Sequence, residues 1–114
     1  GGDRMNRWGI PEQLEREIRK RDKGCVYCHK KMVYPYIHNR HRDCATIEHL
    51  NFDGPFNWKD GLQIKDVVIC CGECNSKRGE KKLEDWFETE YCLSKNINKK
   101  TVAEPVRKYL NCKK

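Results

Sequence analysis

The sequence predicts a small α+β domain whose hydrophobic core needs an additional source of stability. Residues 45–50 and the β-branched run 66–71 predict two strands, and segments with apolar residues at helical spacing lie on both sides of them. Only 37% of the 114 residues are apolar and 36% are charged, with a mean hydropathy of −1.00. A chain of this length and polarity is marginally stable by burial alone. We therefore expect one domain over residues 1–114, held together by more than its core.

Helices are expected at both ends of the chain and after the second strand. In the first, Ile10, Leu14 and Ile18 recur at four-residue spacing, with Pro11 placed for the first helical turn. Farther along, aromatic residues such as Trp86 recur at helical spacing and predict core positions rather than a base-stacking platform. The expected flanking helices cover residues 11–22, 82–95 and 101–110, and another begins in the segment NSKRGEKK.

The charge balance favours a polyanionic partner. The chain has a net charge of +7 and a pI of about 9.0, which is typical of nucleic-acid binding, although a merely solvated cationic surface has the same balance. The sequence has no apolar run long enough to span a membrane and no secretory leader. We therefore expect a cytoplasmic protein with no membrane partner, in which reducing conditions favour bound metal or free thiols over disulfides.

Four of the eight cysteines form two C-x2-C pairs, Cys25 with Cys28 and Cys71 with Cys74. Two tight turns that each present two thiolates match the needs of a tetrahedral zinc ion. Four thiolates leave no open position for water, so the expected role is structural. Such a site contributes on the order of 10 kcal/mol of apparent folding energy, which is enough to decide whether so small a domain folds.

Two other roles for the cysteines compete with this one. A thioredoxin-like redox function of one C-x2-C pair requires a βαβ context, which the sequence lacks. The dense segment HNRHRDC could form a second metal site from His38, His41 and Cys44, or a loop of DNA-contacting or solvated side chains. The remaining cysteines, Cys70, Cys92 and Cys112, are expected to be thiols outside the metal site, the last two buried in helices.

The order of these parts resembles the HNH (His-Asn-His) endonucleases, whose active site is a ββα-metal unit. A C-x2-C turn precedes the strand that ends in Glu48-His49, and a second strand leads into the C-x2-C-N-x2-R-G segment that opens a helix. The resemblance covers residues 24–80 and implies a zinc-stabilised ββα-metal domain that hydrolyses DNA phosphodiester bonds. Restriction enzymes, phages and mobile elements all use this unit.

The resemblance assigns roles to particular residues. His49 matches the general base that activates water, and Glu48 and Asn75 match the ligands of a catalytic Mg²⁺ or Mn²⁺ ion. Asp66 stands where the family has its middle asparagine, a residue that orients the loop and the histidine. Aspartate accepts hydrogen bonds but cannot donate them through an amide, so this is a departure from the family pattern.

The same resemblance implies duplex DNA as the partner. The residues expected to contact DNA are basic and lie near the proposed site: Arg40, Arg42, Lys77 and Arg78. Cutting both strands with one site implies a homodimer. Two alternatives remain open at this point, a non-catalytic zinc module that binds nucleic acid (a degenerate HNH domain) and a zinc-stabilised protein-interaction domain.

Overall fold

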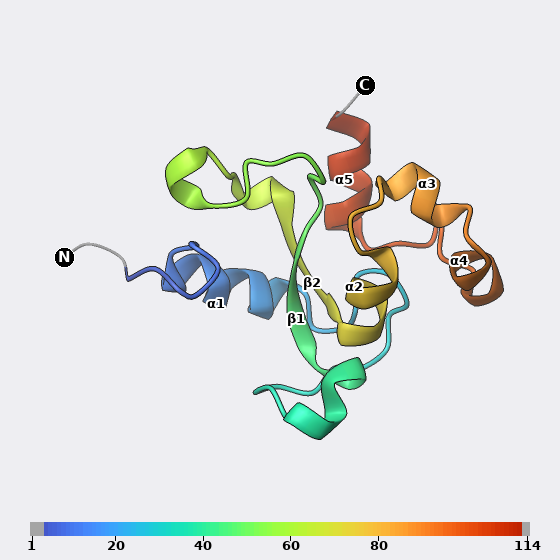
Figure 1. Cartoon of the computed structure of the whole chain (residues 1–114), viewed down its shortest axis with the longest axis horizontal. Helices are drawn as coiled ribbons and strands as arrows, with labels where there is room; N and C mark the ends of the chain where they lie inside the picture. Colours follow the sequence, from blue (N-terminus) through green and yellow to red (C-terminus); the bar gives the residue numbers. More distant parts are fainter. Residues whose placement is uncertain (1–3, 113–114) are drawn as a thin grey trace.

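Two antiparallel strands, β1 (Ala45–His49) and β2 (Val67–Cys71), form the centre of the fold (Figure 1). The computed structural model describes residues 4–112. Both strands lie within one residue of their predicted bounds, and the α+β fold class is confirmed. No helix in this described part has the length and apolar character needed to cross a membrane. The helices are α1 (Glu12–Arg21), α2 (Gly72–Arg78), α3 (Leu83–Phe87), α4 (Glu90–Lys95) and α5 (Glu104–Cys112), with short 3-10 turns η1 (His38–Asp43), η2 (Trp58–Asp60) and η3 (Ile64–Asp66).

The pairing of the strands sets which side chains share a face. Glu48 lies opposite Val68, and His49 lies opposite Val67. Because successive side chains of a strand point to opposite faces, Glu48 and His49 face opposite sides of the hairpin. The long connection between the strands is closed at its base, where the backbone N–H of Leu50 donates to the Asp66 carbonyl at 2.7 Å.

Helix α1 covers the face of the hairpin to which His49 belongs. Its buried Ile18 packs with Ile47, Val67 and Ile69 in one hydrophobic cluster. Acidic residues occupy its first turn and basic residues its last, which suits the helix dipole. The predicted helix over residues 11–22 is therefore confirmed within a residue at each end.

The opposite face is covered by α2 and by the C-terminal helices, which lie on the far side of the hairpin from α1 (Figure 1). The larger hydrophobic cluster lies here and includes Val26, Tyr27, Val68 and Trp86. Trp86 is completely buried and its ring packs edge-on against Tyr27 at 4.8 Å between centroids. Trp86 thus occupies a core position, as its helical spacing predicts.

Gly72, at the start of α2, is the most crowded of the glycines in the described part of the chain. A Cβ atom on Gly72 would lie 2.0 Å from the backbone carbonyl oxygen of His41. The N–H of Gly72 also donates to the Cys44 carbonyl at 3.0 Å. Only glycine permits η1 to pack this closely on the N-terminus of α2.

The C-terminal helices differ from the prediction in two places. The expected helix 82–95 is divided into α3 and α4, because the Thr89 hydroxyl accepts from the N–H of Cys92 and caps a new helix there. The expected helix 101–110 begins later, at Glu104, with Pro105 in its first turn. Thr101 instead closes the preceding turn by donating to the Asn96 carbonyl at 2.7 Å.

Candidate metal centre and the surface around His49

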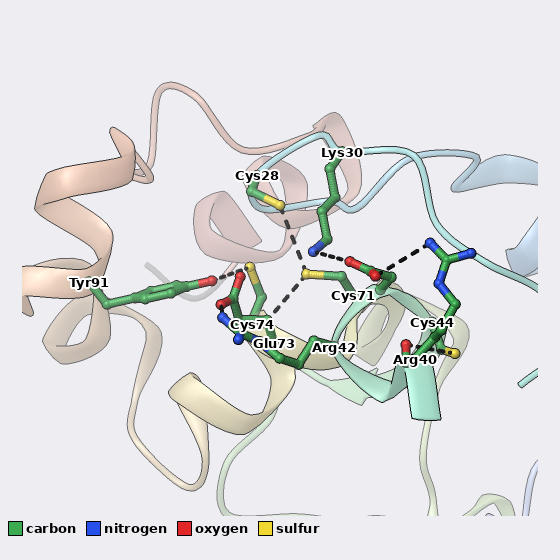
Figure 2. Close-up of polar contacts among 10 residues, drawn as sticks. Cys28, Lys30, Arg40, Arg42, Cys44, Cys71, Glu73, Cys74 and Tyr91 are labelled. Carbon is green, nitrogen blue, oxygen red and sulfur yellow. Dashed lines mark hydrogen bonds and ion pairs between the residues drawn. The ribbon is translucent and has the colours of Figure 1, made fainter. Parts of the chain in front are cut away.

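The four predicted zinc ligands come together in one cluster. Cys25 and Cys28 lie in the turn after α1, Cys71 ends β2, and Cys74 lies in the first turn of α2. Their four sulfur atoms lie within 4.8 Å of one another. Figure 2 shows the sulfurs of Cys28, Cys71 and Cys74 converging. The cluster could hold a metal ion such as zinc.

Hydrogen-bond donors surround the sulfur atoms. The N–H of Tyr27 donates to Cys25 Sγ and the N–H of Cys74 donates to Cys71 Sγ, each at 3.4 Å. The Tyr91 hydroxyl lies 3.3 Å from Cys74 Sγ and points at it in Figure 2. Such donors favour the thiolate form, which is the form that binds metal.

The thiols also act on one another. Hydrogen bonds with Cys25, Cys71 and Cys74 lower the pKa of Cys28 far below that of a free thiol. Hydrogen bonds with Cys25, Cys28 and Cys71 raise the pKa of Cys74. One thiolate is thus stabilised by its protonated neighbours, and all four can ionise together only if a cation balances their charge.

The alternative site at His38, His41 and Cys44 does not form. Within residues 4–112 the four-cysteine cluster is the only group of three or more histidine, cysteine or acidic side chains that converges on a metal position. Cys44 is buried, with its sulfur 3.2 Å from the Arg40 carbonyl. His41 Nδ1 lies 3.3 Å from the Tyr36 hydroxyl instead.

The cysteines outside the cluster divide into two kinds. Cys92 is a buried thiol, as predicted, and Cys70 is buried in β2, outside the cluster. The expectation that Cys112 is buried is wrong, because it lies exposed in the last turn of α5. Its position near the end of the helix, rather than the helical pattern, decides its exposure.

Glu48 lies in the core and not at an open surface. Its side chain is 5% exposed, and its Oε2 accepts from the Tyr27 hydroxyl at 2.7 Å and from Arg78 Nη1 at 3.0 Å. Burial raises the pKa of this carboxyl group, while the positive charge of Arg78 opposes the rise. Glu48 is therefore half of a buried ion pair that joins β1 to α2.

Arg78 corrects one sequence prediction. The motif predicts that it contacts phosphate, but its side chain is 1% exposed. Its guanidinium group donates to the carbonyl oxygens of His49, Leu50 and Lys81 as well as to Glu48. The physical reason is that a guanidinium group carries enough donors to satisfy the free carbonyls at the end of β1, where the strand ladder stops.

The other expected DNA contacts lie at the surface. Lys77 is exposed on α2. Arg42 is 76% exposed and pairs with Glu73, and Arg40 is 54% exposed and lies 3.4 Å from Asp43. Figure 2 shows Arg42 beside Glu73. The charges of both arginines are partly neutralised within the chain.

His49 lies at the end of β1 with its ring half-exposed. Its Nε2 is 2.9 Å from the carbonyl oxygen of Phe56, and the Phe56 ring packs edge-on against it. A carbonyl oxygen can only accept, so Nε2 carries the proton and Nδ1 is left as an acceptor. Burial lowers the pKa of His49, so the ring is neutral at neutral pH. A neutral histidine with a free acceptor nitrogen can take a proton from water.

Asn75 lies on α2 beside the outer edge of β1. Its Nδ2 donates to Thr46 Oγ1 at 2.9 Å and to the Ile47 carbonyl at 3.0 Å. Both N–H bonds of the amide are thus used, which leaves Oδ1 as the atom that could ligate a cation. Ile47 is two residues from His49, so Asn75 contacts β1 close to His49.

Asp66 organises the loop before β2. Its Oδ2 accepts from the backbone N–H of Gln63 at 3.0 Å, within the turn η3. Its negative charge also raises the pKa of His49, against the larger effect of burial. The contact with Gln63 needs an acceptor only, which aspartate supplies as well as asparagine does.

The sequence pattern missed several residues near these side chains. Arg7 and Trp8 line two adjoining hollows, one of which contains His49 and Phe56 and the other Asn75. The only signal for them is the basic and aromatic segment RMNRWG, which lies outside the recognised motif. Nothing in the sequence around Tyr27, inside the first C-x2-C pair, indicates its hydrogen bond to Glu48.

Comparison with known proteins returned no match to any family model, curated protein or solved structure.

Proposed function

We propose that this protein is a DNA endonuclease of the HNH type, with His49 as the general base and a structural zinc ion in the four-cysteine cluster. The observation that carries the proposal is the state of His49. Burial lowers the pKa of the ring, the Phe56 carbonyl sets its tautomer, and the ring is half-exposed at the end of a strand. That combination suits proton abstraction from water.

In this proposal Nδ1 of His49 accepts a proton from the water that attacks phosphorus. The Nε2–H stays bonded to the Phe56 carbonyl, which stabilises the imidazolium ion that forms. By resemblance to the HNH family, the bond from phosphorus to the 3′ oxygen breaks, which leaves 5′-phosphate and 3′-hydroxyl ends.

The cysteine cluster fits zinc well. Four sulfurs within 4.8 Å of one another, drawn from two turns, match a closed tetrahedral site. The zinc ion would hold the turn after α1 against the start of α2, and it would leave no position for water or substrate.

The catalytic Mg²⁺ or Mn²⁺ ion fits the residues less well. Asn75 Oδ1 offers one ligand, but the Glu48 carboxylate is buried and already paired with Arg78. Magnesium sites generally use one or two free carboxylates together with water and phosphate. We therefore assign Glu48 a positioning role, anchoring Arg78 at the end of β1.

The same ion pair favours a second candidate function, a zinc module that binds nucleic acid without cutting it. A domain that has lost its open carboxylate would retain the cysteine scaffold, the basic surface and the net charge of +7. The two candidates differ in a single observable, the cleavage of DNA.

The test is incubation of the zinc-loaded protein with supercoiled plasmid and with oligonucleotides, in Mg²⁺, in Mn²⁺ or with chelator. Cutting that needs Mg²⁺ or Mn²⁺ supports the endonuclease, and binding without cutting under every condition supports the module. The variant Glu48→Gln keeps an oxygen acceptor for Tyr27 and Arg78 but loses the carboxylate. If it needs much more divalent metal than the wild type, Glu48 is a metal ligand and the positioning role is wrong.

A further inference from the structure

We infer that a hollow beside the proposed active site binds an unstacked base of a single-stranded nucleic-acid segment. This aromatic hollow has a volume of about 610 Å³, and its lining includes Trp8, Tyr34, Tyr36, Thr46 and Asn75. The inference rests on the proposed function in one respect, namely that the partner of the surface is nucleic acid.

The three rings are exposed, whereas Tyr27, Trp86 and Tyr109 are buried in the core. Tyr34 is 64% exposed, Tyr36 is 54% exposed and Trp8 is 37% exposed. They come from two segments that are distant in the sequence, the N-terminal segment before α1 and the segment before η1. Residues of both segments line the same hollow. Convergence of three exposed rings from separate segments indicates a surface that binds a partner.

The rings are held in place rather than loosely placed. The Asn6 side chain accepts from the backbone N–H groups of Trp8 and Ile10, at 2.9 and 3.0 Å, and fixes the turn that presents Trp8. The guanidinium group of Arg19 lies 4.4 Å from the Tyr34 ring centroid. A stacking surface that is already ordered loses little entropy when a base binds.

The charge around the hollow complements a phosphate backbone. Arg7 and Arg19 line it, and the one acid in the lining, Glu15, is 16% exposed and is neutralised by Arg19 at 2.8 Å. Arg7 is exposed and has no ion-pair partner among residues 4–112. Its guanidinium group lies 5.4 Å from the Trp8 ring centroid, beside the proposed stacking surface. Aromatic rings for the bases, together with a cation such as Arg7 for the backbone, are the usual elements of single-strand binding.

The hollow also adjoins the proposed catalytic group. Arg7 and Trp8 line both the aromatic hollow and the neighbouring hollow of about 660 Å³ that contains His49. A strand whose base stacks on Trp8 would pass its next phosphate toward His49. Paired duplex offers no free base face there, so this surface selects single-stranded or locally opened substrate.

The experiment measures binding by fluorescence anisotropy, without added Mg²⁺ or Mn²⁺, so that the result does not depend on cleavage. The zinc-loaded full chain is titrated with a labelled oligothymidylate of about 12 nucleotides, with the same chain made abasic, and with a duplex of equal length. We expect Trp8→Ala to weaken binding of the oligothymidylate about tenfold and binding of the abasic chain and the duplex less than twofold.

Two matched controls separate stacking from general effects. Trp58 is 40% exposed but lines neither hollow, so Trp58→Ala should change every affinity less than twofold. Tyr36→Phe keeps the ring and loses only the contact with His41, so it should bind like the wild type, whereas Tyr36→Ala should not.

The inference is overturned if Trp8→Ala and Trp58→Ala have equal effects, or if the abasic chain binds as tightly as the oligothymidylate. If the protein cuts duplex but shows either result, the proposed function stands and this inference is wrong. If the protein never cuts DNA but shows the Trp8 effect, this inference stands and the endonuclease proposal is wrong.

Discussion

At the residue scale, His49 is distinguished by its hydrogen bond to Phe56 and by its half-buried ring. We predict that His49→Ala retains its bound metal and its folded structure and loses about 10²-fold or more of its cleavage rate. Gel assays of plasmid nicking measure the rate. Metal analysis measures the bound metal, which should be retained only if the variant is folded. His38→Ala, on the exposed turn η1, is the matched control and should cut normally.

The cleavage rate should depend on pH through the protonation of His49. Burial lowers the pKa of His49 below the usual 6.5, so the free base persists to a lower pH than that of an exposed histidine. Cleavage should therefore be nearly constant above pH 6.5 and fall only below it, with this acid limb absent from any residual activity of His49→Ala. The lowered pKa also means that the unfolded state binds more protons, so the contribution of His49 to stability is present above pH 6.5 and is lost as the pH falls.

The buried Glu48–Arg78 ion pair should affect the free energy of unfolding. Arg78→Met removes the cation and leaves a carboxylate buried without its partner, which should lower the free energy of unfolding by about 3–5 kcal/mol. The double variant Glu48→Leu/Arg78→Met should recover part of that loss, since no charge is then left unpaired. Urea unfolding of the three proteins measures both effects. Equal stability of Arg78→Met and the wild type would show that the pair is exposed in solution.

At the element scale, the contact between η1 and α2 depends on Gly72. In Gly72→Ala the new methyl group would lie 2.0 Å from a backbone oxygen, which cannot move without displacing η1. We expect a loss of about 3 kcal/mol, the upper range for overpacking. Thermal unfolding measures it, with the exposed Ser76→Ala on the same helix as the control. An unchanged melting temperature would mean that η1 does not pack on α2.

The cysteine cluster joins the turn after α1, the end of β2 and the start of α2. We predict one tightly bound zinc ion per chain, and we expect Cys71→Ser to release it and unfold most of the domain, because the site supplies much of the folding energy. Circular dichroism and metal analysis give both readouts. Cys112→Ser is the control, since that thiol is exposed and distant from the cluster in the sequence. A folded, metal-free Cys71→Ser protein would disprove a structural metal.

At the scale of the whole molecule, the net charge of +7 predicts binding to nucleic acid that weakens steeply with salt. Lys77→Ala should weaken binding similarly across DNA sequences and reduce the slope of log K against log salt by about 1. Lys99→Ala, exposed in the segment between α4 and α5, should leave both unchanged. If the loss for Lys77→Ala were confined to one sequence, Lys77 would read bases rather than phosphate.

The sequence by itself determined the local features of this protein. The C-x2-C spacing requires only a tight turn, so it was enough to predict that Cys25, Cys28, Cys71 and Cys74 form one cluster that could hold a metal ion. Strand alternation likewise required Glu48 and His49 to face opposite sides. Thr89 shows the limit of this approach, because a helical pattern continues through residue 89 while the cap at that position starts a new helix.

Only the tertiary structure decided that Glu48 is buried while His49, at the end of the same strand, stays half-exposed. Alternation does not say which face α2 will cover, and so it could not show that Glu48 is buried or that Arg78 turns inward to meet it. Nor could it place Trp8 beside Tyr34 and Tyr36, because nothing in the local sequence encodes contact between segments so far apart. The free energy that settles such contacts comes from packing and from satisfying buried polar groups across the whole fold, and these depend on the complete chain rather than on any one motif.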